Sequence, residues 1–472
     1  MLLFASLKFW VVFIVFVSLF ALIKRCSRLG MILYVIGFSM YFFYTANGGL
    51  MVLLPLTALF TWLVTEKISS TVPGSFKKFL LSIVVVGDLL PLLYFKYTNF
   101  CLDTLNTLLH TNFPLAQIVL PVGISFYTFQ AISYTVDVYR GRYPAHTPFL
   151  EFLFYLSFFP LLLAGPITRA KTLLPQIKSK RSVSSRMMWI GFALFLSGLV
   201  KKSVIADYIV QFNNWIFESP ADYSGFENLM GVLGYTVQIF CDFSGYSDMS
   251  IGLAALLGFR LKDNFNMPYR ALNPGEFWHR WHISLSTWFR DYLYIPLGGN
   301  RKGNFRTYLN NIITMLVAGL WHGATWMFVL WGGIHGAALA VHKALKKPVL
   351  DKLPNKLPVL ALCWLLNFCF VSVAWVFFRS PNLETCFGIF KRIAADFDMA
   401  YLIPFIQARP VWFVFILIPL FGHLIREKCW RRWHLRFARS PWIVKLLAFL
   451  VVVQLVVTFK VSEVQAFIYA QF

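Results

Sequence analysis

Charged residues are scarce in this chain of 472 residues, and acidic residues are the scarcest of them. Asp, Glu, Lys and Arg make up 13% of the sequence and hydrophobic residues 58%, whereas soluble domains carry about 25% charged residues. This balance excludes a soluble enzyme. Since a helix crosses a bilayer with about 20 apolar residues, we expect an all-α, polytopic membrane protein with about 11 transmembrane helices, within a range of about 10 to 13.

Motifs that mark other protein classes are also missing. The seven cysteines form no CxxC pair, so neither a disulfide framework nor a zinc ribbon is indicated. The absence of a Gly-x-Ser-x-Gly elbow argues against a serine hydrolase, and the absence of a P-loop against ATP-driven work. No internal repeat suggests a transporter's duplicated halves. The first residues lack the charged start of a signal peptide, so residues 2–23 are expected to be a retained span with its N-terminus outside.

Lys and Arg are absent from residues 97–139, 203–259 and 307–342. Short loops rich in these residues stay in the cytoplasm, so we expect the stretches 99–114 and 207–227 to be extracytoplasmic loops. The net charge of +23 comes from basic clusters elsewhere. In a chain this apolar, we interpret it as cytoplasmic-loop charge and contact with anionic headgroups rather than as nucleic-acid binding.

Two segments are too short or too polar to span a membrane. Phe149–Pro166 is an apolar run with basic clusters on both sides, which predicts a re-entrant segment or half-helix buried in protein. Residues 260–306 combine basic residues with several Trp and Tyr rings, which favour the headgroup level. We expect this second segment to lie in or under the cytoplasmic interface.

The strongest single feature is His322, within Leu320–Trp326. It lies in the middle of residues 307–342, which contain no Asp, Glu, Lys or Arg. An ionisable residue at membrane depth is costly and is therefore a functional hypothesis. The alternative is a neutral histidine hydrogen-bonded to a neighbouring helix. Gly319 and Gly323 favour a site, because small residues let a substrate or another backbone approach the imidazole.

His335 follows thirteen residues later, within Trp331–Gly336. At about 100° per residue the two histidines do not share a face of one straight helix. A break at Gly332 and Gly333 would change this. His335 can therefore serve either helix packing or the site.

A third feature is the block from Asn273 to Tyr294, where His279 and His282 stand three residues apart beside Arg280 and Arg290. Such a group could bind a metal, act in acid–base chemistry or hold an anionic cofactor. The basic setting and the lack of carboxylate or thiol ligands at suitable spacing disfavour a metal. The alternative is an interfacial, basic amphipathic stretch with no further role.

Together these motifs resemble the membrane-bound O-acyltransferase (MBOAT) superfamily, and within it the branch of alginate O-acetylation proteins. The matching motifs occur in one order over most of the chain: Leu93–Tyr97, Leu120–Gln130, Asp137–Gly141, Phe159–Pro160, Ala164–Ile167, Asp242–Asp248, Glu276–Tyr294, Trp321–Gly323, Trp375–Arg379 and Phe467–Tyr469. The first 90 residues and the stretch 380–440 match weakly. The resemblance implies a single MBOAT domain over 1–472, with peripheral helices over 1–90, an acyltransferase core over 91–345 and C-terminal helices over 346–472.

The family also implies a reaction and a site. An acyl group would pass from a cytoplasmic thioester, acetyl-CoA or an acyl-carrier protein, across the membrane to a hydroxyl acceptor. The expected catalytic residues are His322 and His282, the latter standing where many relatives have Asn. Imidazole suits this reaction because its pKa lies near neutrality. The basic block would attract the donor by charge. The remaining expected site residues are Arg280, Arg290 and Trp278 for the donor, and His335, His279 and Asp242 as support, with no metal.

The acceptor stays open among three polymers. Alginate or another exopolysaccharide is the first choice, peptidoglycan the second and D-alanylated teichoic acid the third. The expected partners are an extracytoplasmic acetyltransferase or esterase-like protein, the polysaccharide and the lipid bilayer, with no nucleic acid, at a bacterial cytoplasmic (inner) membrane. A transporter or flippase, and a non-catalytic scaffold of an envelope complex, are the alternatives.

Overall fold

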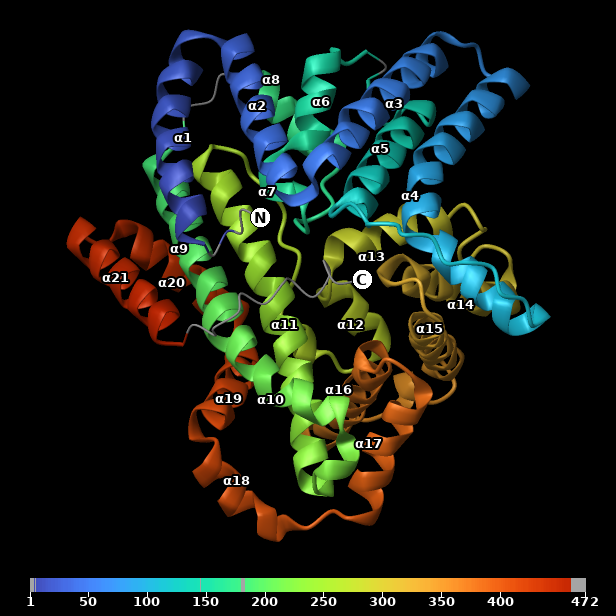
Figure 1. Cartoon of the computed structure of the whole chain (residues 1–472), viewed down its shortest axis with the longest axis vertical. Coiled ribbons are helices and arrows are strands. Elements are labelled where there is room, and N and C mark those ends of the chain that lie inside the picture. Colours follow the sequence, from blue (N-terminus) through green and yellow to red (C-terminus); the bar gives the residue numbers. More distant parts are fainter. Residues whose placement is uncertain (1–3, 5, 145, 180–182, 460–472) are drawn as a thin grey trace. The chain divides into compact units, whose positions relative to one another are not determined.

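The structure, a computed structural model, describes residues 4, 6–144, 146–179 and 183–459. The chain is 80% helical, and its described residues contain no strand (Figure 1). The predicted all-α class is therefore confirmed. Part of the expected first span, at residues 2, 3 and 5, lies outside the described residues, as does the motif Phe467–Tyr469.

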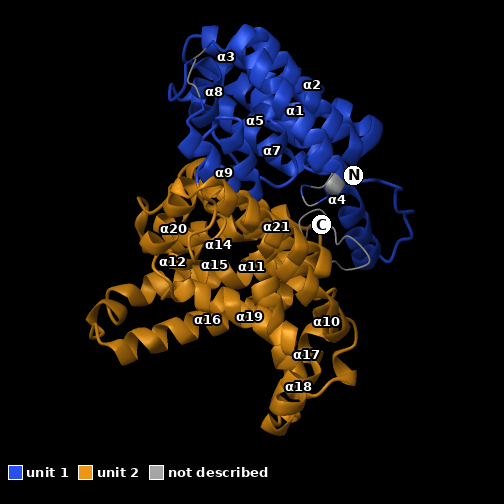
Figure 2. Cartoon of the chain, turned by 90° about the vertical axis from the view of Figure 1, so that its left-hand side faces the viewer, with its two compact units in different colours: residues 1–192, 249–262 blue, residues 193–248, 263–472 orange. Residues whose placement is uncertain are grey.

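The chain forms two compact units, coloured separately in Figure 2. Unit 1 comprises residues 1–192 and 249–262, and unit 2 comprises residues 193–248 and 263–472. Two helices, α9 (Ser185–Leu199) and α11 (Gly225–Leu256), begin in one unit and end in the other. Unit 1 otherwise contains α1 (Leu7–Cys26), α2 (Arg28–Asn47), α3 (Leu53–Ser70), α4 (Ser75–Leu109), α5 (Ile124–Tyr139), α6 (Phe149–Ser157), α7 (Phe159–Leu162) and α8 (Ala170–Lys178).

Unit 2 holds the predicted site residues. Its helices are the π-helical turn η2 (Val200–Ala206), α10 (Asp207–Glu218), α12 (Pro274–Arg280), α13 (Ile283–Phe289), α14 (Gly303–His322), α15 (Trp326–Lys346), α16 (Leu357–Arg379), α17 (Leu383–Ala395), α18 (Leu402–Ala408), α19 (Pro410–Leu424), α20 (Glu427–Arg439) and α21 (Trp442–Thr458).

Several helices begin at polar capping residues that the sequence supplies. The side chain of Ser27 accepts the Gly30 N–H at 3.0 Å at the start of α2. Asn273 accepts the Glu276 N–H at 2.8 Å at the start of α12, where Pro274 follows the cap. Such caps satisfy backbone donors that have no partner within the helix. They fix where these helices begin in an otherwise apolar chain.

The number of spans depends on how polar a spanning helix is allowed to be. Among the described residues, six helical stretches are long and apolar enough to cross a membrane, or up to eight if each of two bent helix pairs is one span. A polytopic protein is thus confirmed with fewer spans than the 11 expected. Helix α11 has 32 residues but is not among the six, and it carries Glu227, Asp242 and Asp248. Hydropathy alone underrates a helix whose polar residues are matched inside the protein.

The expected extracytoplasmic loops are shorter than predicted. Helix α4 continues to Leu109, and α10 occupies residues 207–218. Asp207, the first residue of the second expected loop, accepts from Lys202 Nζ at 2.7 Å. On the same helix, Ile209 and Ile216 are fully buried. An ion pair within the protein therefore replaces the expected contact with water.

The two segments expected not to span are built from short elements. Helix α6 has nine residues, about 14 Å at the rise of an α-helix, and it is followed by the four-residue α7. Both are buried, as a half-helix requires. Between residues 260 and 306 the helices are equally short, with seven residues each in α12 and α13.

Helices α14 and α15 form a tight hairpin joined by residues 323–325. Glycines at the interface bring the two backbones together. A Cβ atom on Gly319 would lie 2.1 Å from the Phe328 carbonyl oxygen, and one on Gly332 would lie 2.2 Å from the Met315 carbonyl oxygen. Small residues at such contacts are typical of helix packing in membranes. This hairpin carries both His322 and His335.

The predicted sidedness of unit 2 can be tested by labelling. We expect residue 221 to face the outside and residue 304 the cytoplasm, because Lys and Arg flank only the second. Both Ala221 and Asn304 are exposed, whereas Ser224 is 8% exposed and bonded to Glu227. Single cysteines at 221 and 304 in a cysteine-free parent should react with an impermeant maleimide from opposite sides. Labelling of both from one side would contradict the predicted topology.

Candidate active site

His322 is the last residue of α14 and is 3% exposed. Its ring packs edge-on against Trp331 of α15, with centroids 5.2 Å apart, and against Phe378 of α16 at 5.4 Å. Trp321, the preceding residue, lies at 5.1 Å. The imidazole is therefore buried among aromatic side chains of α14, α15 and α16.

His282 lies near Trp321 as well, with ring centroids 6.2 Å apart. It is fully buried, and its ring meets Phe243 of α11 edge-on at 4.5 Å. Burial lowers the pKa of His282 to about 3, so this imidazole is neutral at physiological pH. The two predicted catalytic histidines thus contact the same tryptophan.

His335 joins the same aromatic cluster through Trp331, at a centroid distance of 4.9 Å. Trp278 of α12 lies 5.1 Å from His335 and 5.8 Å from Trp331. His335 is fully buried, and its ring nitrogens have no hydrogen-bond partner among the described residues. The structure therefore brings together His322, His282, His335 and Trp278 from three sequence motifs.

The break that Gly332 and Gly333 would have permitted does not occur. The chain turns at residues 323–325, and both glycines lie inside α15. The reason is packing: a Cβ on Gly323 would lie 2.1 Å from the Phe328 ring, so a glycine is needed at the turn itself. The turn lets the two histidines lie on separate helices and still meet at Trp331.

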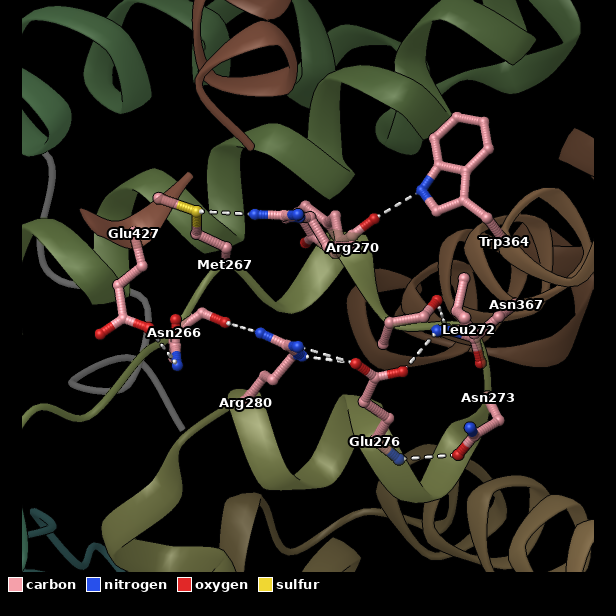
Figure 3. A network of polar contacts seen from close by, with 12 residues as sticks. Asn266, Met267, Arg270, Leu272, Asn273, Glu276, Arg280, Trp364, Asn367 and Glu427 are labelled. Carbon is pink, nitrogen blue, oxygen red and sulfur yellow. Dashed lines mark hydrogen bonds and ion pairs between the residues drawn. The ribbon is translucent and has the colours of Figure 1, made fainter. Parts of the chain in front are cut away.

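Arg280 belongs to a polar network around α12 (Figure 3). Its Nε donates to Glu276 at 2.9 Å and its Nη1 to the Asn266 carbonyl oxygen at 3.1 Å, while Nη2 lies 2.8 Å from Glu276. Glu276 also accepts the Leu272 N–H at 2.9 Å. These contacts hold α12 in place, so donor binding by Arg280 would compete with them.

The other two basic candidates lie further from the cluster. Arg290 is 54% exposed in its side chain and donates to Asp291 at 2.9 Å. His279 is exposed on α12, unlike the three buried histidines. The side chain of Arg290 is thus accessible to an anionic acyl donor. His279 is exposed and is not part of the buried aromatic cluster.

Asp242 lies one residue before Phe243 and is 2% exposed. Its Oδ1 atom lies 2.5 Å from Lys202 Nζ, which also donates to Asp207 at 2.7 Å. A buried ammonium flanked by two carboxylates satisfies the rule that buried charges are paired. Asp242 therefore supports the helix that carries Phe243, and its partner Lys202 was not predicted, because a π-helical turn leaves no spacing signal in sequence.

Among the described residues, no three His, Cys, Asp or Glu side chains come close enough together to hold a metal ion. What the cluster offers instead is imidazole nitrogen in apolar surroundings. Such groups can accept and release a proton near a reacting hydroxyl. The arrangement suits acid–base chemistry on a polar group that enters from outside the aromatic wall.

Comparisons with known proteins agree with this chemistry. Residues 92–383 match the model of the MBOAT, membrane-bound O-acyltransferase family. The chain is 41% identical over 353 residues to the probable alginate O-acetylase AlgI of Azotobacter vinelandii, covering 72% of this chain and 69% of that protein. It is 44% identical over 311 residues to the probable alginate O-acetylase AlgI of Pseudomonas aeruginosa, covering 65% and 58%. It is 38% identical over 379 residues to the peptidoglycan O-acetyltransferase of Helicobacter pylori, covering 75% and 72%. The chain therefore belongs to the membrane-bound O-acyltransferase family.

Proposed function

We propose that this protein transfers an acetyl group from a cytoplasmic thioester to a hydroxyl of a cell-envelope polysaccharide, with alginate as the first candidate. The acceptor oxygen bonds to the acyl carbon, the carbon–sulfur bond breaks, and the hydroxyl proton ends on the leaving thiolate. His322 takes that proton as general base, and His282, which lies near the same tryptophan, accepts a hydrogen bond from the reacting hydroxyl.

One observation carries the proposal: two buried imidazoles share contact with Trp321 inside an apolar cluster. A neutral imidazole can accept a hydrogen bond or a proton from the acceptor hydroxyl, and apolar surroundings keep water from competing with that hydroxyl. Trp321–Gly323 lies within the family match over residues 92–383, and the chain is 41% identical over 353 residues to a probable alginate O-acetylase.

The donor is acetyl-CoA or the thioester of a carrier protein. Residues 260–306 are rich in Lys and Arg, and such a surface attracts phosphates by charge. Arg290 is the better placed of the two predicted arginines, because Arg280 is held by Glu276 and Asn266. Trp278 forms the wall of the cluster next to His335.

The proposed setting is the inner membrane of a bacterium, with the donor in the cytoplasm and the polysaccharide outside. An extracytoplasmic acetyltransferase or esterase-like protein would complete delivery to the polymer. The several apolar helices of the described chain support a membrane location, and the acceptor lies beyond the membrane because envelope polymers do.

The test is acetyl transfer in inside-out membrane vesicles from an alginate-producing host, supplied with radiolabelled acetyl-CoA. We expect labelled O-acetyl ester on the enclosed polymer, and none with vesicles that lack the protein. Export of polymer without label would instead indicate a transporter. Label transferred only from an acyl-carrier thioester would identify the carrier as the donor, and D-alanyl rather than acetyl ester would replace the proposed acyl group.

A second candidate acceptor is peptidoglycan. It is favoured by the 38% identity to a peptidoglycan O-acetyltransferase over 75% of this chain. In the same vesicles, label on muramic acid rather than on the uronic-acid polymer would select this acceptor while leaving the acetyl-transfer chemistry unchanged.

A further inference from the structure

Asn264 lies at the centre of a buried polar cluster beside His282. It is 1% exposed and occupies a non-helical stretch that follows α11. Its main-chain oxygen accepts the Ile283 N–H at 2.9 Å, and its Oδ1 accepts the Ser284 N–H at 3.1 Å. These are the first two N–H groups of α13, which have no partner within that helix. Asn264 thus caps α13 from 18 residues before His282.

This cap explains the backbone of His282. His282, the residue directly before α13, has φ 41° and ψ 54°, in the left-handed region, which is uncommon for a residue with a Cβ. Such conformations persist where surrounding contacts hold them, and they are concentrated at functional sites. Here the two oxygens of Asn264 hold the two peptide groups that follow His282.

The same amide sets which nitrogen of His282 carries the proton. A backbone N–H can only donate, so the Asn264 atom facing the Ser284 N–H is the oxygen, and Nδ2 points instead to Ser247 Oγ at 3.1 Å. Oδ1 also lies 3.3 Å from Nδ1 of His282 and accepts the Ser284 hydroxyl at 2.8 Å. Ser284 Oγ also lies 3.5 Å from Nδ1, but its hydrogen is directed to Oδ1 at 2.8 Å. Because an amide oxygen can only accept, this arrangement favours the hydrogen of the neutral ring on Nδ1.

The lone pair of the neutral ring therefore resides on Nε2. From that atom the neutral ring of His282 can accept a hydrogen bond, but it carries no hydrogen there to donate to a leaving thiolate. This matches the role of binding the acceptor hydroxyl and fits poorly with the role of general acid.

We propose that Asn264 is a positioning residue for His282, which fixes the Nε2 atom as the accepting nitrogen and holds the left-handed backbone on which the ring stands. The inference rests on the proposed function, because it requires His282 to act on the acceptor hydroxyl. Nothing in the motif around Asn264 indicates this role, since its contacts reach a separate short helix.

The test compares three variants, together with His282→Ala, at matched membrane abundance and unchanged thermal unfolding in detergent. Asn264→Ala removes Oδ1 and should lower kcat by about 10- to 100-fold, because small misplacements of a reacting group have effects of that size, with the KM for acetyl-CoA unchanged within about twofold. Asn264→Asp keeps an acceptor towards Ser284 N–H and Nδ1–H, and should recover at least about tenfold of the loss. Ser247→Ala removes only the partner of Nδ2 and should stay within about twofold of the parent.

The outcomes separate this inference from the proposed function. His282→Ala with parental activity would remove His282 from the reaction altogether. A severe loss in His282→Ala together with parental kcat in Asn264→Ala would overturn the positioning role alone. So would a raised KM in place of a lowered kcat, or an Asn264→Asp variant no better than Asn264→Ala. If Asn264→Ala does not accumulate in the membrane, Asn264→Gln replaces it in the test and is judged by the same criteria. Its side chain is one methylene longer, so the amide oxygen no longer matches the positions of the Ser284 N–H and of Nδ1 of His282.

Discussion

Replacing His322 by alanine should lower acetyl transfer by at least about 10²- to 10⁴-fold, the range that general-base catalysis typically supplies. The ring is 3% exposed and has aromatic side chains on its flanks, Trp321, Trp331 and Phe378. A methyl group there leaves these rings in place but removes the only atoms that can take a proton at that position. The loss should appear in kcat, with the protein present in the membrane at parental abundance.

His322→Gln is the more demanding version of this experiment. Glutamine keeps hydrogen bonding but cannot take a proton near neutral pH, so we expect it to be nearly as inactive as alanine. His342→Ala is the matched control, because His342 lies on α15 and is partly exposed outside the aromatic cluster. Acetyl-ester content of the envelope polysaccharide in a deletion strain measures all three. Near-normal acetylation by His322→Gln would refute the base and leave His282 as the next candidate.

The histidine at the centre of the candidate site is conspicuous in the sequence because an ionisable residue is rare at membrane depth. A histidine in a window without charge is costly unless it is used or bonded, and this pointed to His322 before any contact was known. His335 and His282 were reached through their own motifs. The structure adds that tryptophans connect them: Trp321 lies near both His282 and His322, and Trp331 contacts both His322 and His335.

The sequence could not reveal which glycines form turns and which pack helices together, or which buried polar groups pair with each other. Gly323 makes a turn, whereas Gly332 packs two helices together, and both are followed by residues that a helix tolerates. Asp207 was expected in a loop and Asp242 as support of the site, and only the structure shows that both pair with Lys202. Asn264 is a single amide in a non-helical stretch, and its partners Ile283 and Ser284 belong to α13. Each of these depends on contacts between segments that no local pattern encodes.

The packing of α14 against α15 predicts that alanine substitutions at two adjacent glycines of α15 differ in their effect on stability. Gly332→Ala places a Cβ 2.2 Å from the Met315 carbonyl oxygen, whereas Gly333→Ala places one 3.5 Å from a Leu316 side-chain carbon, an ordinary contact. Backbone cannot move aside as a flexible side chain can. Overpacking typically costs about 1–3 kcal/mol, so Gly332→Ala should lower thermal stability in detergent, while Gly333→Ala should be neutral or gain up to about 1 kcal/mol from its helix propensity.

Gly332→Ala should also reduce acetyl transfer, because it pushes α15 away from α14 and with it Trp331, the ring that touches both His322 and His335. Displacements of about 1 Å can lower rates by about 10²-fold. Thermal unfolding in detergent and acetyl-ester yield, measured for both variants at equal abundance, give the comparison. Equal behaviour of Gly332→Ala and Gly333→Ala would mean that the hairpin is not held at this glycine. A loss confined to Gly332→Ala would show that the close contact of α14 and α15 sets the geometry of the site.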